Sequence, residues 1–296
     1  MKILVFVKQV VDTKVAIECD PRTGTIKDEW NVAVMDPEGK TAIESAVELK
    51  NSVTDTAVTL VCLGRKADEA VLRAGLTMGC NEAIRVWDEG FDSLHSHGKA
   101  VVLARIARIL GYDLILTGTK SQDTASGQLG ALLARELLIP CVSGVVRFSR
   151  SGESVTATKR LDEGFEQQIE ASLPLVIGMK ADDLASSYSS FPRVVEATKK
   201  VIPCYDLSDI GLPSGTIAEA ELLKYGPVRF PDARPVFIAA PDSSLSGFER
   251  RERLRAGTMK KREGRLVSGA EDTVVEEVFQ TLRRGGWLSH LDSGSK

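Results

Sequence analysis

The chain has 296 residues, of which 43% are hydrophobic and 27% are charged, and its formal net charge is -3 at pH 7. These values are typical of a folded protein with a sizeable core, and they exclude a disordered chain and a protein that coats nucleic acid. We therefore expect no nucleic-acid partner.

The N-terminal sequence MKILVFVKQV has five consecutive apolar residues followed by Lys8, which is too short a run for a signal peptide or a membrane span. It predicts a first strand and a cytoplasmic protein. Because the cysteines form no CxxC pair, we expect reduced, buried thiols in an intracellular setting. The cysteines are Cys19, Cys62, Cys80, Cys141 and Cys204.

Short apolar runs alternate with amphipathic stretches along the first half of the chain. The pattern predicts strands at KILVFV, AVTLVCL, AIRVW and DLILTG, and helices over about 37–50, 67–78, 98–110 and 126–138. Asp36 is placed to cap the first of these helices, with Pro37 in its first turn. This order predicts an α/β fold with a doubly wound, mostly parallel sheet.

After Pro140 the sequence changes to an alternation of period two around the turn cluster SRSGE, which indicates an antiparallel extension of the sheet. We expect an α/β domain over 1–180, a polar loop and short basic helix over 181–200, and an extended C-terminal arm over 201–296. The arm carries a basic segment from Arg250 to Arg265 and ends in an amphipathic helix. The basic segment is either a partner-binding surface or a solvated run of charge.

The stretch TGTKSQDTASGQLG begins in the strand DLILTG and leads into a helix. Open parallel sheets bind ligands at this edge, and the N–H groups at a helix start favour an anion. Hydroxyl donors are available from Thr119, Ser121, Thr124 and Ser126. The same residues also fit a simpler role, with Thr124 or Ser126 capping the helix and Gly118 turning the chain. The stretch matches neither GxxxxGK[ST] nor GxGxxG.

The sequence contains no evident catalytic or metal-binding set. His95 and His97 lie close together without a third ligand in view, each cysteine lies in or beside an apolar segment, and no two carboxylates are placed as an acid–base pair. We therefore predict no catalytic residue and no metal. A nucleotide pocket without such groups favours a carrier or partner subunit over an enzyme.

Taken in order, several segments resemble the beta subunit of electron-transfer flavoproteins. KILVFVKQVVDT resembles the family's opening VKxVxD strand, and MDPEGKTAIESAVELK resembles its NPxDExAxEEAxxLK segment. The most specific block is DLILTGTKSQDTASGQLGALLARELLIP, which is similar to DLILxGxQAIDGDTGQVxxxLAxxLGLP. The resemblance covers roughly residues 1–210 and the final helix.

The resemblance implies a subunit that pairs with an alpha subunit, helps to hold FAD near their interface and binds AMP in a pocket of its own. The flavin would perform the redox chemistry. Carried over to this sequence, the pocket contains Phe6, Asp36 where the family has Asn, Leu63 and a turn. The turn comprises Gly118, Thr119, Lys120, Ser121, Gln122, Asp123, Thr124, Ala125, Ser126, Gly127, Gln128 and Leu129.

Two departures from the family pattern bear on the ligand. Ionised Asp36 only accepts hydrogen bonds, so beside a phosphate it must face ribose or a backbone N–H. The turn reads Asp123-Thr124-Ala125-Ser126, without the second acidic residue of the family's DGDT, which favours hydroxyl donors over a metal. In electron-bifurcating members this pocket holds a second FAD, and KQVVDT and DSLHS are similar to their KQVPDT and DTLAT. A second FAD in place of AMP is therefore an open alternative.

The loop over 181–192 resembles the segment with which the family docks acyl-CoA dehydrogenases. Its anchor would be Phe191, flanked by Tyr188, although Ser186 and Ser187 replace the Arg-Pro that usually precedes the Tyr. The alternative is that Phe191 packs into the chain's own core. Electrons would pass from an acyl-CoA dehydrogenase of fatty acid beta-oxidation, or another flavin dehydrogenase, to a membrane quinone oxidoreductase or another acceptor. The basic segment would embrace the alpha subunit, or an acidic or membrane-associated acceptor.

Two other classes stay open. A stand-alone ATP or AMP sensor of the universal-stress type shares this adenine-nucleotide-binding α/β layout and phosphate turn, but it leaves the sequence after 180 unexplained. An ATP-consuming enzyme would need catalytic and metal-binding groups that the sequence does not reveal.

Overall fold

The computed structural model describes residues 1–20, 23–24, 26–27, 32–92, 94–181, 189–220, 223, 226, 241–256 and 267–284. The chain divides into two compact units, Met1–Phe230 and Pro231–Lys296. The first unit carries the sheet and the candidate site.

A nine-stranded sheet forms the centre of the first unit, in the order β11-β5-β4-β1-β6-β10-β7-β8-β9. Every pair from β11 to β7 is parallel, while the pairs β7–β8 and β8–β9 are antiparallel. This confirms the α/β fold with a mostly parallel sheet and an antiparallel extension. The strands are β1 (Lys2–Val7), β4 (Ala57–Leu63), β5 (Glu82–Val86), β6 (Leu114–Gly118), β7 (Cys141–Ser151), β8 (Ser154–Arg160), β9 (Glu166–Ser172), β10 (Leu175–Met179) and β11 (Cys204–Tyr205). A small antiparallel sheet pairs β2 (Gln9–Val11) with β3 (Ala33–Met35).

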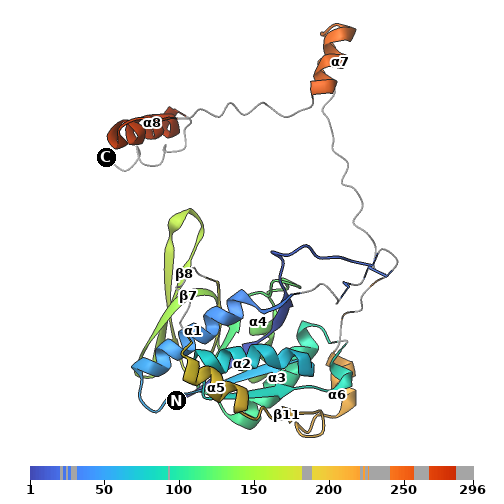
Figure 1. Ribbon diagram of the computed structural model, residues 1–296, viewed down its shortest axis with the longest axis vertical. Helices are drawn as coiled ribbons and strands as arrows, with labels where there is room; N and C mark the ends of the chain where they lie inside the picture. Colours follow the sequence, from blue (N-terminus) through green and yellow to red (C-terminus); the bar gives the residue numbers. More distant parts are fainter. Residues whose placement is uncertain are drawn as a thin grey trace. The chain divides into compact units, whose positions relative to one another are not determined.

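Helices cover both faces of the parallel strands (Figure 1). One face packs against α1 (Pro37–Ser52), α2 (Glu69–Met78) and α5 (Phe191–Lys199), and the other against α3 (Ser96–Leu110), α4 (Leu129–Leu137) and α6 (Ser214–Ala220). Because successive strand residues point to opposite faces, β1 contributes Ile3 and Val5 to the first core and Leu4 and Phe6 to the second. Among the described residues, short 3-10 helices lie at η2 (Lys66–Asp68), η3 (Glu89–Phe91) and η4 (Asp162–Gly164).

Local signals explain where the helices begin and end. Asp36 caps α1 by accepting a hydrogen bond from the Gly39 N–H (3.2 Å), and α2 ends at Gly79, whose φ is 118°. The helix predicted from 126 starts instead at Leu129, because Ala125 and Gly127 have φ values of 49° and 64°. These left-handed residues keep the stretch before α4 as a turn.

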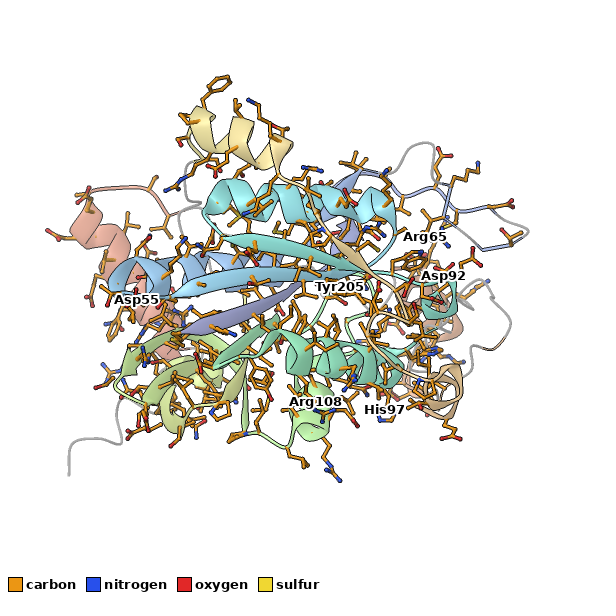
Figure 2. All side chains as sticks on the ribbon, turned by 90° about the horizontal axis from the view of Figure 1, so that it is seen from below. Asp55, Arg65, Asp92, His97, Arg108 and Tyr205 are labelled. Carbon is orange, nitrogen blue, oxygen red and sulfur yellow. The ribbon has the colours of Figure 1, made fainter. Side chains whose placement is uncertain are left out.

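Ion pairs and backbone contacts mark the two ends of the parallel strands (Figure 2). Before β4, the carbonyl of Asp55 accepts a hydrogen bond from the N-terminal amine of Met1 (2.6 Å). After β4, the Arg65 guanidinium donates to Asp92 (2.5 Å) and lies 5.7 Å from the centre of the Trp87 ring. Because the side chains of this ion pair are exposed, it contributes little to stability.

The residues after 200 belong partly to the first unit. There β11 extends the sheet beside β5, and Ile217 of α6 joins the core formed with α3 and α4. The second unit contains α7 (Gly247–Ala256) and α8 (Glu271–Arg284). An apolar stripe on α8 is exposed, made of Val275, Val278, Phe279 and Leu282. The sequence-based boundaries at 180 and 200 stay predictions, and the basic segment beyond Ala256 lies outside the described residues.

The cysteines are all free. Cys62 and Cys80 are buried, and burial raises the pKa of each thiol to about 12. Cys19 and Cys204 are exposed, so the expectation of buried thiols is wrong for these two. Cys19 lies outside the main sheet, between β2 and β3, and Cys204 lies in the two-residue edge strand β11. In the described part of the chain, no helix has the length and apolar character needed to cross a membrane.

Candidate functional site

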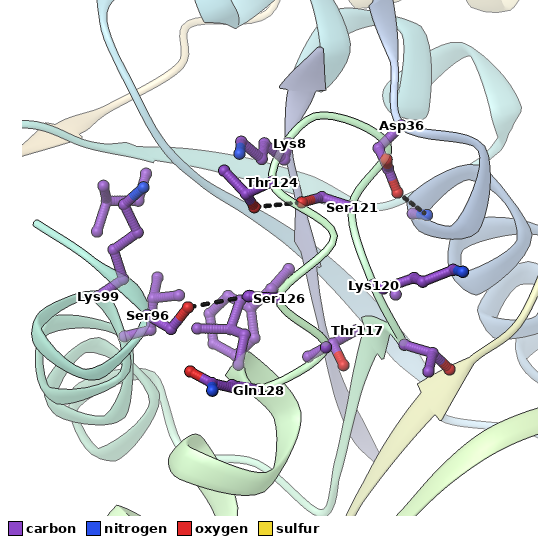
Figure 3. Close-up of a pocket in the computed structure, with 18 of the residues that line it drawn as sticks. Lys8, Asp36, Ser96, Lys99, Thr117, Lys120, Ser121, Thr124, Ser126 and Gln128 are labelled. Atoms are coloured by element: carbon purple, nitrogen blue, oxygen red, sulfur yellow. Dashed lines mark hydrogen bonds between the residues drawn. The ribbon is translucent and has the colours of Figure 1, made fainter. Parts of the chain in front are cut away.

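A cavity of about 350 Å³ lies at the carboxyl edge of the parallel strands (Figure 3). It is centred where β1 has β4 on one side and β6 on the other, which is the position where open α/β sheets bind ligands. Apolar residues from strand ends and helices form one wall, and the turn between β6 and α4 forms the other. The cavity is lined by Phe6, Val7, Lys8, Asp36, Gly39, Val61, Leu63, Leu94, His95, Ser96, Lys99, Leu103, Thr117, Gly118, Thr119, Lys120, Ser121, Thr124, Ser126, Gly127, Gln128, Leu129 and Leu223.

Most of the residues predicted for the pocket line this cavity. The exceptions are Gln122, Asp123 and Ala125. The Gln122 side chain donates to the hydroxyl of Thr13 (2.5 Å), and Asp123 pairs with Lys8. Ser121, Thr124 and Ser126 of the turn thus line the cavity, while Gln122, Asp123 and Ala125 do not. That the lining residues bind a nucleotide stays a prediction.

Two carboxylates at the start of α1 hold the turn by its backbone. Asp36 Oδ1 accepts a hydrogen bond from the Gln122 N–H (2.8 Å), while its Oδ2 accepts from Gly39. Glu38 Oε2 accepts from the Lys120 N–H (2.5 Å). Both carboxylates are buried. An ionised Asp36 beside a phosphate was expected to face ribose or a backbone N–H. Both of its oxygens accept hydrogen bonds from backbone N–H groups, as that expectation requires.

Gly118 and Thr119 anchor the base of the turn. A Cβ on Gly118 would lie 3.0 Å from the Cβ of Glu38 and 3.4 Å from Asp36 Oδ2, so only glycine allows this approach of β6 to α1. The Thr119 hydroxyl donates to the carbonyl of Gly178 (3.0 Å) and accepts from the Gly144 N–H (3.1 Å). Thr119 thus joins the turn to β10 and β7, and its hydroxyl is engaged within the protein.

The first turns of α3 and α4 meet at the cavity. Ser96 Oγ, at the start of α3, lies 3.0 Å from Ser126 Oγ, and Ser121 Oγ lies 2.9 Å from Thr124 Oγ1 (Figure 3). The side chain of Gln128 makes no capping hydrogen bond to α4. Backbone N–H groups at helix starts, together with the helix dipole, favour an anion at this position.

Charged groups around the turn add to its anion-binding character. Lys8, Lys99 and Lys120 all line the cavity. Burial raises the pKa of Asp123, but hydrogen bonds from Lys8 and Ser121 and the charge of Lys8 lower it by more, so the net shift is downward. Asp123 thus stays ionised and paired with Lys8, while Lys99 and Lys120 contribute positive charge to the cavity.

Thr117 lines the cavity, and its buried hydroxyl, beside Gly130 of α4, has no hydrogen-bond partner among the described residues. Thr117 is 1% exposed and is the fourth residue of β6. Buried polar atoms almost always have a partner, so an isolated hydroxyl beside a cavity indicates a position for a ligand's polar group.

Several lining residues were not predicted from the sequence. They include Lys8, His95, Ser96, Lys99 and Thr117. The sequence pattern could have pointed to the α3 residues. The helix α3 follows the parallel strand β5, and the carboxyl end of β5 must lie at the same edge of the sheet as that of β6. The run DSLHS stands at that position.

Two further groups of predicted residues can be placed. Phe191 is 76% exposed at the start of α5, so it is not packed in the chain's own core, whereas Tyr188 lies outside the described residues. His95 lines the cavity, and His97 Nδ1 hydrogen-bonds the carbonyl of Ala220 (2.6 Å). Within the described ranges, no three His, Cys, Asp or Glu side chains are grouped to hold a metal ion.

The family model described as "Electron transfer flavoprotein domain" matches residues 23–201. The "Electron transfer flavoprotein subunit beta" of Bacillus subtilis is 31% identical over 215 residues, which is 72% of this chain and 81% of the relative. The "Caffeyl-CoA reductase-Etf complex subunit CarD" of Acetobacterium woodii is 29% identical over 213 residues, 72% of this chain and 80% of the relative. The beta subunit of Mycobacterium tuberculosis is 28% identical over 228 residues, 74% and 84% of the two chains.

The match covers β3 to β10 and α5, including the cavity-forming turn, and it begins after β1 and β2. Electron-transfer flavoproteins are associated with a flavin, and their beta subunits pair with an alpha subunit. The order of motifs, the mostly parallel sheet and the extent of similarity agree: the chain belongs to the electron-transfer flavoprotein family and is one of its beta subunits.

Proposed function

We propose that this beta subunit binds AMP in the cavity at the end of β6 and helps to hold FAD together with an alpha subunit. The observation that supports AMP is the two-sided lining of the cavity. Phe6, Leu63 and Leu103 offer an apolar wall suited to a base, and the turn offers hydroxyl groups, lysines and two helix starts suited to a phosphate.

AMP would have a structural role in this arrangement. Its phosphate would take the backbone N–H groups at the start of α4 and the hydroxyl of Ser126, and Asp36 would not repel it strongly, because Gly39 and Gln122 already engage that carboxylate. The bound FAD would supply the redox chemistry of the heterodimer. This chain would then position cofactors and partners and carry no catalytic residue of its own.

The electron donor would dock near α5. Phe191 projects from the start of that helix and is largely exposed, as a docking anchor requires. The proposed donor is an acyl-CoA dehydrogenase or another flavin dehydrogenase, and the proposed acceptor is a quinone oxidoreductase.

A second FAD in the same cavity is the alternative ligand. The observation that favours it is the start of α3, where Ser96 and Lys99 line the cavity beside Ser126 of the turn. Two helix starts can hold two phosphate groups, and FAD has two where AMP has one. One relative is named as subunit CarD of a caffeyl-CoA reductase-Etf complex, so association with a reductase occurs among similar proteins.

The test is to co-express the full chain with its alpha subunit, purify the heterodimer, and release and quantify the nucleotides. One FAD and one AMP per heterodimer supports the simple carrier, and two FAD supports the alternative. A heterodimer that contains FAD but no second nucleotide would rule out both uses of the cavity. If no complex and no flavin are recovered while the isolated chain binds ATP, the stand-alone sensor becomes the better description.

A further inference from the structure

The helix α5, which carries the exposed Phe191, is held on the fold by few apolar contacts. It packs on the outer side of α2 (Figure 2). Of its nine residues, all of them described, only Ala197 is buried. A helix this short is marginally stable by itself, and one small buried side chain adds little hydrophobic stabilisation. The position of α5 therefore depends largely on polar contacts.

Arg73 of α2 holds the end of α5. Its Nη1 donates to the carbonyls of Ala197 (2.9 Å), Thr198 (3.2 Å) and Lys200 (3.3 Å). Carbonyls at the end of a helix lack N–H partners within the helix, and the helix dipole favours a cation there. The guanidinium is kept in place by Glu69, one turn earlier in α2, whose carboxylate lies 3.6 Å from Nη2. One side chain of α2 thus caps α5.

Thr77, one turn further along α2, holds the start of α5. Its hydroxyl donates to the carbonyl of Ala74 (2.6 Å) and accepts a hydrogen bond from the hydroxyl of Ser189 (3.1 Å). Ser189 lies two residues before Phe191, and the chain is described without a gap from 189 to 200. Both ends of α5 are therefore fastened to the same helix.

We propose that α2 positions the helix on which the electron donor docks, with Arg73 fixing its end and Thr77 its start. This inference rests on the proposed docking of the donor at α5. Phe191 and Val194 lie one turn apart and are both exposed, so they form one apolar face whose direction depends on how α5 is held. An anchor held in its binding position loses less conformational freedom when the partner binds. Arg73 and Thr77 act through this face and are positioning residues.

The test measures how fast excess acyl-CoA dehydrogenase reduces the FAD of the heterodimer, over a range of dehydrogenase concentrations. Arg73→Met should raise the concentration that gives half of the limiting rate by about fivefold to tenfold, because α5 then presents Phe191 correctly for only part of the time. The limiting rate should change by less than about twofold, because the docked complex is the same.

Three further variants sharpen the test. Thr77→Val should also raise the half-saturating concentration. Arg73→Lys should retain most of the affinity, because an ammonium group also donates to carbonyl oxygens. Arg108→Met is the matched control and should behave as the wild type, because Arg108 donates to the carbonyl of Glu136 at the end of α4, not of α5.

A double-mutant cycle separates positioning from general destabilisation. If Arg73 acts through the position of Phe191, Arg73→Met should change the half-saturating concentration by less than about twofold when Phe191 is already replaced by Ala. An effect of the same size with and without Phe191 would overturn the inference.

The possible failures are distinct. If the dehydrogenase does not reduce the wild-type heterodimer, or if Phe191→Ala alone leaves the half-saturating concentration unchanged, the proposed docking site fails and this inference fails with it. If Phe191→Ala weakens docking while Arg73→Met and Thr77→Val do not, the docking site stands and the role of α2 is wrong. Should Arg73→Met give no folded heterodimer, Thr77→Val decides, because it removes one hydroxyl and keeps the shape of the side chain.

Discussion

The hydroxyl of Ser96, at the start of α3, lies 3.0 Å from the hydroxyl of Ser126, in the turn before α4. This contact brings the starts of α3 and α4 to one cavity. The two helices follow β5 and β6, which lie on opposite sides of β1 in the sheet. An anion bound there would meet hydroxyl groups from both sides.

Ser126→Leu should abolish nucleotide binding in the cavity. The side chain lines the cavity, so a branched apolar group would occupy ligand space and remove a hydroxyl donor. The nucleotide content of the purified heterodimer measures this, and thermal unfolding should change little, because Ser126 is exposed in the ligand-free chain. Ser126→Ala is the matched control for the hydroxyl alone. Full retention of AMP in the Leu variant would show that the contacts lie elsewhere.

Thr117→Val should stabilise the ligand-free chain and weaken ligand binding. The Thr117 hydroxyl is buried without a partner, so replacing it with a methyl group of similar size removes a desolvation cost of about 1–3 kcal/mol. If the hydroxyl contacts AMP, the Kd should rise by about threefold to tenfold. Denaturant unfolding and calorimetric titration measure the two effects. A less stable variant with unchanged affinity would contradict the assignment.

Gly118→Ala should destabilise the chain by about 1–3 kcal/mol. The added Cβ would approach the Cβ of Glu38 to 3.0 Å, where both neighbours are held by hydrogen bonds to the turn. Gly39→Ala is the control, because its Cβ would have only ordinary contacts at 3.9 Å in a helix. The control should change the free energy of unfolding by no more than about 1 kcal/mol. Equal denaturation midpoints for the two variants would refute this account of Gly118.

Stability should depend on pH through Glu38. Its folded-state pKa is raised above the ordinary value of 4.5, chiefly by burial and with a further contribution from Asp36, while the N–H groups of Lys120 and Ala181 and the charge of Lys120 oppose the rise. The folded state therefore holds the proton more tightly, and Glu38 makes the chain less stable as pH rises from 4.5 through the raised pKa. Glu38→Gln should thus gain stability relative to the wild type over this window. If the free energies of unfolding of the wild type and Glu38→Gln differ by the same amount at every pH, Glu38 is not the source of the pH dependence.

Phe191→Ala should weaken docking of the electron donor without changing the fold. Because Phe191 is 76% exposed, its truncation should alter the free energy of unfolding by less than about 0.5 kcal/mol. A buried anchor at an interface commonly contributes enough for a loss of about tenfold or more in affinity. The rate of flavin reduction by an acyl-CoA dehydrogenase, measured at several donor concentrations, separates docking from electron transfer. Val201→Ala, at another exposed apolar position, is the control.

The fold was largely predictable because its strong signals are local. The apolar runs of β1 and β4 and the stripe and cap of α1 each depend on neighbouring residues, and the observed elements lie at those positions. The two-residue strand β11 has no such pattern, and its pairing with β5 depends on the rest of the sheet.

From the residues alone, the site was predictable only where one continuous stretch forms it, while the positions of Phe6, Asp36 and Leu63 followed from the family resemblance. The turn from Gly118 to Leu129 was identified from its motif, but Ser96 reaches the cavity through the topology of the sheet. Glu38 was not singled out from the sequence, because an acidic residue in a first helical turn is ordinary beside the helix dipole. Only the structure brings its carboxylate to the Lys120 N–H.

The exposed apolar stripe of α8 has a practical consequence. Val275, Val278, Phe279 and Leu282 lie on one side of a helix that, in the described chain, buries none of its residues. Such a surface attracts chaperones, proteases and other unfolded chains until something covers it. A preparation of this chain in which nothing covers α8 should therefore tend to self-associate, and a charged residue in place of Phe279 should reduce that tendency.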